Sequence, residues 1–162
     1  MAKLTLLAFM ALCTFASVAL VNAVNQFNVE GRVYCDTCRA GFETNVTEPI
    51  GAGAKVRIEC KKYNTVGPIL YSVDGITDNA GKYKIVAQGD HEDQTCEVVL
   101  VESPRPDCKE INKALNHAPI GLFKDNGIAS NDRYPNALGF VKDKPLDVCG
   151  AIMKYYETEE ED

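Results

Sequence analysis

Residues 27–38 read Phe-Asn-Val-Glu-Gly-Arg-Val-Tyr-Cys-Asp-Thr-Cys, and this stretch decides the fold class. From Phe27 to Cys35 the residues of one face are apolar or glycine, while polar or charged residues dominate the positions between them. A period of two is typical of a β-strand with one buried face. The strand ends at a Cys-x-x-Cys pair, Cys35 and Cys38. Whether these cysteines are structural or reactive therefore bears on both the fold and the function.

Alternation of the same kind recurs along the chain and predicts an all-β domain. The expected strands cover residues 27–35, 54–60, 69–76, 82–87, 96–101, 120–123 and 138–141. Residues 96–101 are apolar on both faces, so we expect this strand to be central. Between two of the strands, Asp78 and Gly81 indicate a tight hairpin turn. Short strands separated by turns predict a small antiparallel β-barrel or sandwich of about seven strands.

Two segments show helical spacing instead. Residues 107–115 place apolar side chains on one face behind a candidate cap at Asp107. Residues 147–156 do so more clearly, and we expect a short C-terminal helix whose inner face carries four residues. These four are Cys149, Ile152, Met153 and Tyr156.

The N-terminus has the pattern of a secretory signal peptide. Lys3 supplies a positive start, residues 4–20 carry no charge, and Ala23 is a small residue at a suitable cleavage position. We therefore expect a signal peptide at residues 1–23, one domain at residues 24–156 and an acidic, disordered tail at residues 157–162. A membrane anchor is the weaker interpretation, because no cluster of Lys or Arg follows the apolar run.

The cysteine count fits an exported protein. Six cysteines follow the leader, at Cys35, Cys38, Cys60, Cys96, Cys108 and Cys149. An even set in a small exported domain predicts three disulfides and a structural role. Their pairing stays open at this point, because six cysteines allow 15 connectivities.

The net charge argues against some classes of binding partner, and one motif predicts a covalent modification. The net charge of −6 does not suit nucleic acid or anionic lipid. Asn45 starts an Asn-Val-Thr sequon in a polar segment, and in a secreted chain we expect it to be glycosylated.

The Cys-x-x-Cys pair is the sharpest chemical motif. A thiol–disulfide oxidoreductase would need a helix starting at Cys35 to stabilise the thiolate, and the following residues show no helical pattern. A zinc site would need a second cysteine pair, whereas the other four cysteines are separated along the chain. A structural disulfide role is therefore favoured at Cys35 and Cys38, with the oxidoreductase as the alternative.

The two histidines and the many carboxylates form no catalytic pattern. His91 stands among Asp90, Glu92 and Asp93, which we interpret as a solvated turn, and His117 has no nucleophile nearby in sequence. We therefore expect no enzyme activity, no metal and no cofactor.

The chain resembles the family of the major olive pollen allergen. The closest motif is Glu-Gly-Arg-Val-Tyr-Cys-Asp-Thr-Cys-Arg at residues 30–39, and the resemblance extends over nearly all of the mature chain. Its further segments are residues 53–56, 77–83, 89–92, 96–98, 103–105, 126–128, 136–140 and 144–146, with the remaining cysteines. Gly51-Ala52-Gly53 departs from the family, where an acidic residue usually precedes the glycine.

This resemblance implies a secreted plant glycoprotein of pollen with an all-β fold and no established catalytic activity. It also implies the pairs Cys35–Cys108, Cys38–Cys149 and Cys60–Cys96. The family is associated with pollen hydration, germination and tube growth. As an allergen, such a protein would be bound by IgE.

Three functions follow as hypotheses. The first is an extracellular binding module that recognises a receptor ectodomain or a cell-wall component through the loops at residues 42–50 and 61–68. The second is the thiol–disulfide oxidoreductase at Cys35 and Cys38. The third is a passive constituent of the cell-wall matrix.

Overall fold

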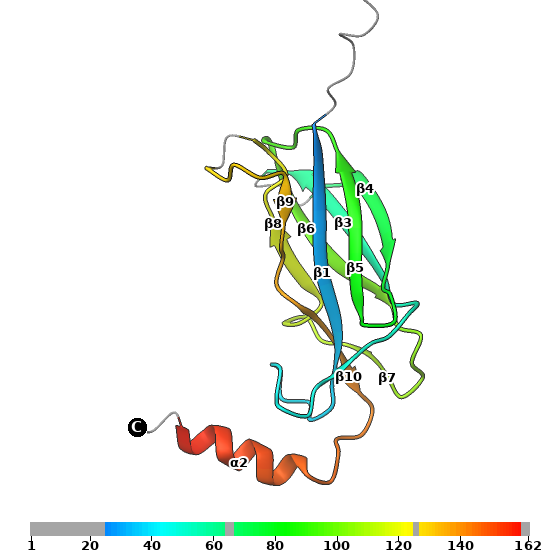
Figure 1. Ribbon diagram of the computed structural model, residues 1–162, viewed down its shortest axis with the longest axis vertical. Helices are drawn as coiled ribbons and strands as arrows, with labels where there is room; N and C mark the ends of the chain where they lie inside the picture. Colours follow the sequence, from blue (N-terminus) through cyan, green and yellow to red (C-terminus); the bar gives the residue numbers. More distant parts are fainter. Residues whose placement is uncertain (1–24, 64–66, 125–126, 160–162) are drawn as a thin grey trace, which may run out of the picture.

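Two β-sheets face each other in the computed structural model, which describes residues 25–63, 67–124 and 127–159 (Figure 1). The strands are β1 (Gln26–Asp36), β2 (Glu48–Pro49), β3 (Lys55–Lys62), β4 (Ile69–Ile76), β5 (Lys82–Gln88), β6 (Gln94–Glu102), β7 (Cys108–Ile111), β8 (His117–Ile120), β9 (Asp132–Arg133) and β10 (Leu138–Lys142), and the described helix is α2 (Cys149–Glu159). The all-β class with a C-terminal helix and three disulfides is confirmed.

The first sheet is organised around β1, which runs along most of the sandwich in Figure 1. Its first seven residues pair antiparallel with β5, and its last four pair parallel with β10. Beside these partners lie the short strands β9, parallel to β1, and β2, antiparallel to it. The sheet is therefore mixed rather than purely antiparallel, because the chain crosses through the second sheet before it returns to β1 as β9 and β10.

The second sheet has the order β4-β3-β6-β8, and all of its pairs are antiparallel. β6 lies between β3 and β8, as expected for a central strand. Only one face of β6 is buried, however: Val98 and Leu100 point into the core, whereas Val101 is exposed. The core between the sheets is built from the alternating apolar residues, and its largest fully buried side chains are Phe27, Phe140, Ile50, Ile58, Leu122 and Leu138.

Two predicted elements differ from the structure. Residues 108–111 form β7 and not a helix, because Cys108 and Glu110 pair with β10 and Cys108 is bonded to Cys35. The strand expected at residues 120–123 lies earlier, at His117–Ile120. Leu122 is buried, but its carbonyl accepts a hydrogen bond from the His91 N–H in a loop.

The helix α2 lies at the end of the sandwich where β10 and β7 are found (Figure 1). Cys149 and Ile152 are buried on its inner face, where Tyr156 packs beside them. The helix runs to Glu159, three residues into the segment expected to be a disordered tail. The expected signal peptide and residues 160–162 lie outside the described residues. Across the described ranges, none of the helical segments has the length and apolar character needed to span a membrane.

Candidate functional site

Two disulfides clamp the end of the sandwich that carries α2. Cys35–Cys108 joins β1 to β7, and Cys38–Cys149 joins the turn after β1 to α2. Cys35 and Cys38 are thus each bonded to a distant cysteine and not to each other. A turn follows Cys35 instead of a helix. These observations disfavour the oxidoreductase alternative, which needs a redox pair within the motif.

The turn between these cysteines is ordered by the buried carboxylate of Asp36. Its two oxygens accept hydrogen bonds from the backbone N–H groups of Cys38 at 3.3 Å, Ala40 at 3.0 Å and Gly41 at 2.8 Å. Because a carboxylate can accept several bonds, one side chain satisfies three backbone donors. The chain therefore leaves β1 along a fixed path into the segment that begins at Phe42.

The loop at residues 42–50, one of the two predicted recognition loops, is anchored at both of its ends. Phe42 packs edge-on against Tyr156 of α2, with ring centroids 5.3 Å apart, and Ile50 is fully buried. Within the loop, the Thr44 N–H donates to the Thr47 hydroxyl at 2.8 Å and closes a turn. Asn45 is exposed at this turn, where a glycan would extend into solvent.

Two surface hollows meet at Arg32 on β1. The first, of about 280 Å³, is lined by Glu30, Lys82 and Tyr134 among others. The second, of about 260 Å³, lies against the anchored loop and is lined by Glu43, Thr44 and Thr47 among others. We call Arg32 and these six residues the Arg32 face.

Exposed charges give the Arg32 face its chemistry, and the buried phenol of Tyr34 lines the second hollow beside them. The Arg32 guanidinium donates to both oxygens of Glu43, with Nη2–Oε2 at 2.6 Å, while 56% of its side chain stays exposed. Exposed ion pairs typically contribute no more than about 1 kcal/mol, so a ligand carboxylate with the same two-point geometry can exchange for Glu43. Burial, with a smaller contribution from Glu43, raises the pKa of Tyr34 in the second hollow to about 12. The phenol of Tyr34 therefore stays neutral even near pH 10, where a free tyrosine is about half ionised.

A separate ion network fixes the neighbouring loop before β7. Arg105 donates to Glu48 at 2.6 Å and to Asp107 at 2.9 Å, and Lys142 also contacts Asp107. These hydrogen bonds, first from Arg105 and then from Lys142, lower the pKa of the Asp107 carboxyl. Asp107 thus links its own loop to the end of β10 and does not cap a helix as the sequence predicted.

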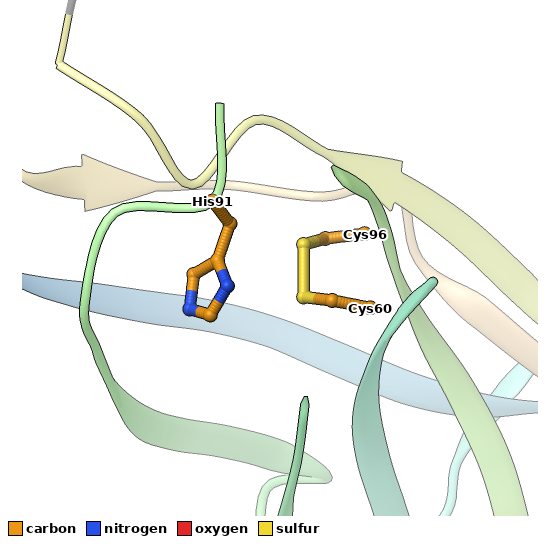
Figure 2. Close-up of side chains that lie close together, drawn as sticks. All are labelled: Cys60, His91 and Cys96. Carbon is orange, nitrogen blue, oxygen red and sulfur yellow. A yellow bond between two sulfur atoms is a disulfide. The ribbon is translucent and has the colours of Figure 1, made fainter. Parts of the chain in front are cut away.

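The surroundings of His91 differ from the solvated turn that was expected. His91 is buried, and its ring lies beside the Cys60–Cys96 disulfide (Figure 2). Metal-ligand atoms of the three residues lie within 4.8 Å of one another. Spacing along the chain gave no sign of this cluster, because it forms only when β3 and β6 pair and the loop after β5 folds over them.

The other predicted site residues are placed apart. Residues 64–66 of the second recognition loop lie outside the described residues, and Tyr63 beside them is exposed. His117 is exposed on β8, with its Nδ1 3.0 Å from the Asn116 side-chain oxygen. Tyr134 was not predicted; the structure leaves its side chain 73% exposed, and the signal in the sequence is an aromatic residue within a polar segment.

Comparison with known proteins gives the family. The family model described as "Pollen protein Ole e 1 like" matches residues 25–157. The chain is similar to the pollen-specific protein C13 of Zea mays, with 45% identity over 99% of this chain and 95% of that protein. It is also similar to the pollen allergen Che a 1 of Chenopodium album, with 40% identity over 89% of this chain and 87% of that protein. Its fold matches the crystal structure of the major plantain pollen allergen Pla l 1, with a TM-score of 0.66, 35% identity, and coverage of 75% of this chain and 97% of the other. The chain therefore belongs to the Ole e 1-like family of pollen proteins.

Proposed function

We propose that this pollen-related protein is a secreted, non-enzymatic binding module. The Arg32 face binds its partner, which is a cell-wall component or the ectodomain of a cell-surface receptor. The observation that carries the proposal is the pair of hollows that meet at Arg32 on a frame clamped by two disulfides. A rigid frame lowers the entropy cost of ordering loops on binding, which favours recognition by a small surface.

The chemistry of the Arg32 face suits a sugar-bearing partner with carboxylate groups. Tyr134 offers an exposed ring on which a sugar can stack, and its hydroxyl can form a hydrogen bond. Arg32 and Lys82 offer two cations to an acidic group, which would displace Glu43 from Arg32, while the nearby Glu30 carboxylate is held by Lys84. Uronic-acid polysaccharides of the wall and glycosylated receptor ectodomains both carry such groups.

Binding to the Arg32 face can be tested with paired variants. We expect R32A and Y134A each to weaken binding about tenfold, since truncated Arg and Tyr anchors carry most of the energy of an interface. The measurement is the dissociation constant against arrays of wall polysaccharides and plant receptor ectodomains. Two variants outside the predicted recognition loops serve as matched controls. R57A removes an exposed Arg–Asp pair from the second sheet, and Y155A removes a tyrosine of α2 that is 59% exposed. Equal affinities of all four variants, or no binding by the unmodified protein to either array, would rule out this face.

Glycosylation of Asn45 is a further expectation of the secreted protein. The acceptor is exposed at a turn next to the second hollow, so a glycan there would border the Arg32 face without filling it. Protein isolated from the plant should lose mass on treatment with an enzyme that removes N-linked glycans. An N45Q variant expressed in the same tissue should show no loss. An unchanged mass of the unmodified protein would contradict occupancy of this site.

A further inference from the structure

The buried contact between His91 and the Cys60–Cys96 disulfide lies on the second sheet, apart from the Arg32 face. The exposed fractions of Cys60, Cys96 and His91 are 0%, 3% and 6%. We propose that reduction of this disulfide creates a Cys₂His site for a soft divalent metal ion, with Zn²⁺ as the ion that fits its ligands.

The strand pairing keeps the two cysteines together without the bridge. Cys60 and Cys96 lie directly opposite each other in the β3–β6 ladder, with their Cα atoms 4.1 Å apart. The ladder continues on both sides of them, from Lys55 opposite Glu102 to Lys62 opposite Gln94. Backbone hydrogen bonds therefore hold the sulfur atoms near each other after reduction. The Cys38–Cys149 bridge has no such support, since it joins a turn to a helix.

Hydrogen bonds fix the ring of His91 in the orientation that a metal ligand needs. Its Nε2 lies 3.0 Å from the backbone oxygen of Gln88, and a carbonyl can only accept, so Nε2 carries the proton. The other nitrogen, Nδ1, lies on the side of the sulfur atoms (Figure 2). Metal-bound histidines usually donate their remaining N–H to a carbonyl or carboxylate in this way. In addition, the backbone N–H of His91 donates to the Leu122 oxygen at 2.9 Å, which fixes the loop.

After reduction, the ligand atoms need to move by no more than about 2 Å to bind a zinc ion. Zinc bound tetrahedrally at about 2.3 Å from sulfur and about 2.0 Å from nitrogen places neighbouring ligand atoms about 3.5–3.8 Å apart. The three ligand atoms already lie within 4.8 Å of one another, and the two sulfur atoms, which are bonded in the oxidised protein, have to separate to about 3.8 Å; side-chain rotations after reduction can bring all three into place. Two thiolates with an imidazole favour Zn²⁺ over the hard cations Mg²⁺ and Ca²⁺.

A surface hollow gives access to this corner of the sheet. It has a volume of about 360 Å³, and Cys96, Gln94 and Glu92 are among the residues that line it. The Gln94 side-chain amide reaches within 3.2 Å of Nδ1 of His91, and because Nε2 carries the proton, the amide NH₂ is the group that can donate to Nδ1. Rotation of this amide would offer its oxygen to a metal as the fourth ligand, or a water molecule can take that place.

The redox step balances with a dithiol reductant of the thioredoxin class. A thiolate of the reductant attacks one sulfur of the Cys60–Cys96 bond and forms a mixed disulfide, which its second thiol resolves. The reductant becomes a disulfide, and two electrons and two protons pass to Cys60 and Cys96. Binding of Zn²⁺ then releases the thiol protons to solvent, since the thiolate is the ligand.

The test compares metal binding by the reduced and the oxidised protein. Under non-denaturing reduction we expect one Zn²⁺ per chain, measured by competition with a chromogenic chelator, and no binding by the oxidised protein. Co²⁺ should give the same stoichiometry, with thiolate-to-metal absorption bands. The H91N variant should bind at least about tenfold more weakly, because it lacks one direct ligand. The H117N variant changes the exposed histidine instead and should bind as the unmodified protein does.

A double variant separates this site from the other four thiols. Reduced C60S/C96S still carries Cys35, Cys38, Cys108 and Cys149, and we expect it to bind no Zn²⁺ at the concentrations that saturate the unmodified protein. Equal binding by the double variant or by H91N would overturn the proposal. So would loss of the near-ultraviolet circular dichroism when Cys60 and Cys96 alone are reduced, as mapped by alkylation and mass spectrometry.

Discussion

The C35A/C108A variant should lose about 4 kcal/mol of unfolding free energy relative to the unmodified protein. The Cys35–Cys108 bond closes a loop across a sequence separation of 73 residues. In the chain-entropy model a cross-link stabilises by restricting the unfolded chain, and a loop of this length corresponds to about 4 kcal/mol. Alanine suits both positions, because both cysteines are fully buried and a serine hydroxyl would add an unpaired polar group. Equilibrium denaturation in urea without reductant measures the loss.

The C60A/C96A variant serves as the comparison. Its bridge closes a shorter loop, with a separation of 36 residues, so the same model expects a loss smaller by less than about 1 kcal/mol. Both variants should keep the far-ultraviolet circular dichroism of the unmodified protein, because the sheets pair through backbone hydrogen bonds. A loss below about 1 kcal/mol for C35A/C108A would show that this bridge does not hold the clamped end together.

Local alternation predicted the strands well wherever one face of the strand meets the core. The strand expected at residues 27–35 is β1, and that expected at residues 54–60 lies almost entirely within β3. In β3 every second side chain is buried, whereas β1 alternates only in its first half and is buried on both faces from Val33 to Asp36. The turn at residues 77–81 also forms as expected, with the Asp78 carboxylate accepting from two backbone N–H groups. Period and turn chemistry depend on neighbours in sequence, so the sequence alone reveals them.

Elements decided by distant partners were predicted poorly. The spacing of Cys108, Ile111 and Leu115 suggested a helix, but three of the four residues of β7 are exposed, and pairing with β10 outweighs their local pattern. The parallel pairing of β1 with β9 and β10 likewise depends on where the returning chain meets β1. Long-range contacts of this kind leave no period in the sequence.

In the candidate site, too, features set by neighbours in sequence could be predicted and contacts between distant segments could not. Its supports were accessible from sequence, since the cysteines and the anchored loop were both recognised. The pairing of the cysteines came from the family resemblance, because residue types alone left the connectivities open. The meeting of Arg32 with Tyr134, and of His91 with Cys60 and Cys96, depends on how segments far apart in the chain are brought together.

Replacing Gly81 with alanine should cost about 3 kcal/mol of unfolding free energy and disturb the Arg32 face. Gly81 has a φ of +73°, which an L side chain adopts only with strain. A Cβ atom there would lie 2.8 Å from the backbone oxygens of Val33 and Ile50. Both oxygens belong to main chain held in hydrogen bonds, since the Ile50 N–H donates to Val33 and the Val33 N–H donates to Gly81. Relief of the clash therefore has to move β1 or the end of the loop at residues 42–50. Urea denaturation measures the cost.

The G41A variant separates the strain of the backbone angle from the clash. Gly41 has a similar φ of +84°, but its Cβ would meet no heavy atom within 4 Å. We expect G41A to cost only about 1 kcal/mol, the penalty for a left-handed conformation at alanine. The difference between the two variants then measures the close approach of the turn to Val33 and Ile50. Because that approach positions the loop that carries Thr44 and Thr47, G81A should also weaken partner binding more than G41A does. Equal losses of stability for both variants would show that the turn and the loop move apart at little cost, and that the Arg32 face does not depend on their contact.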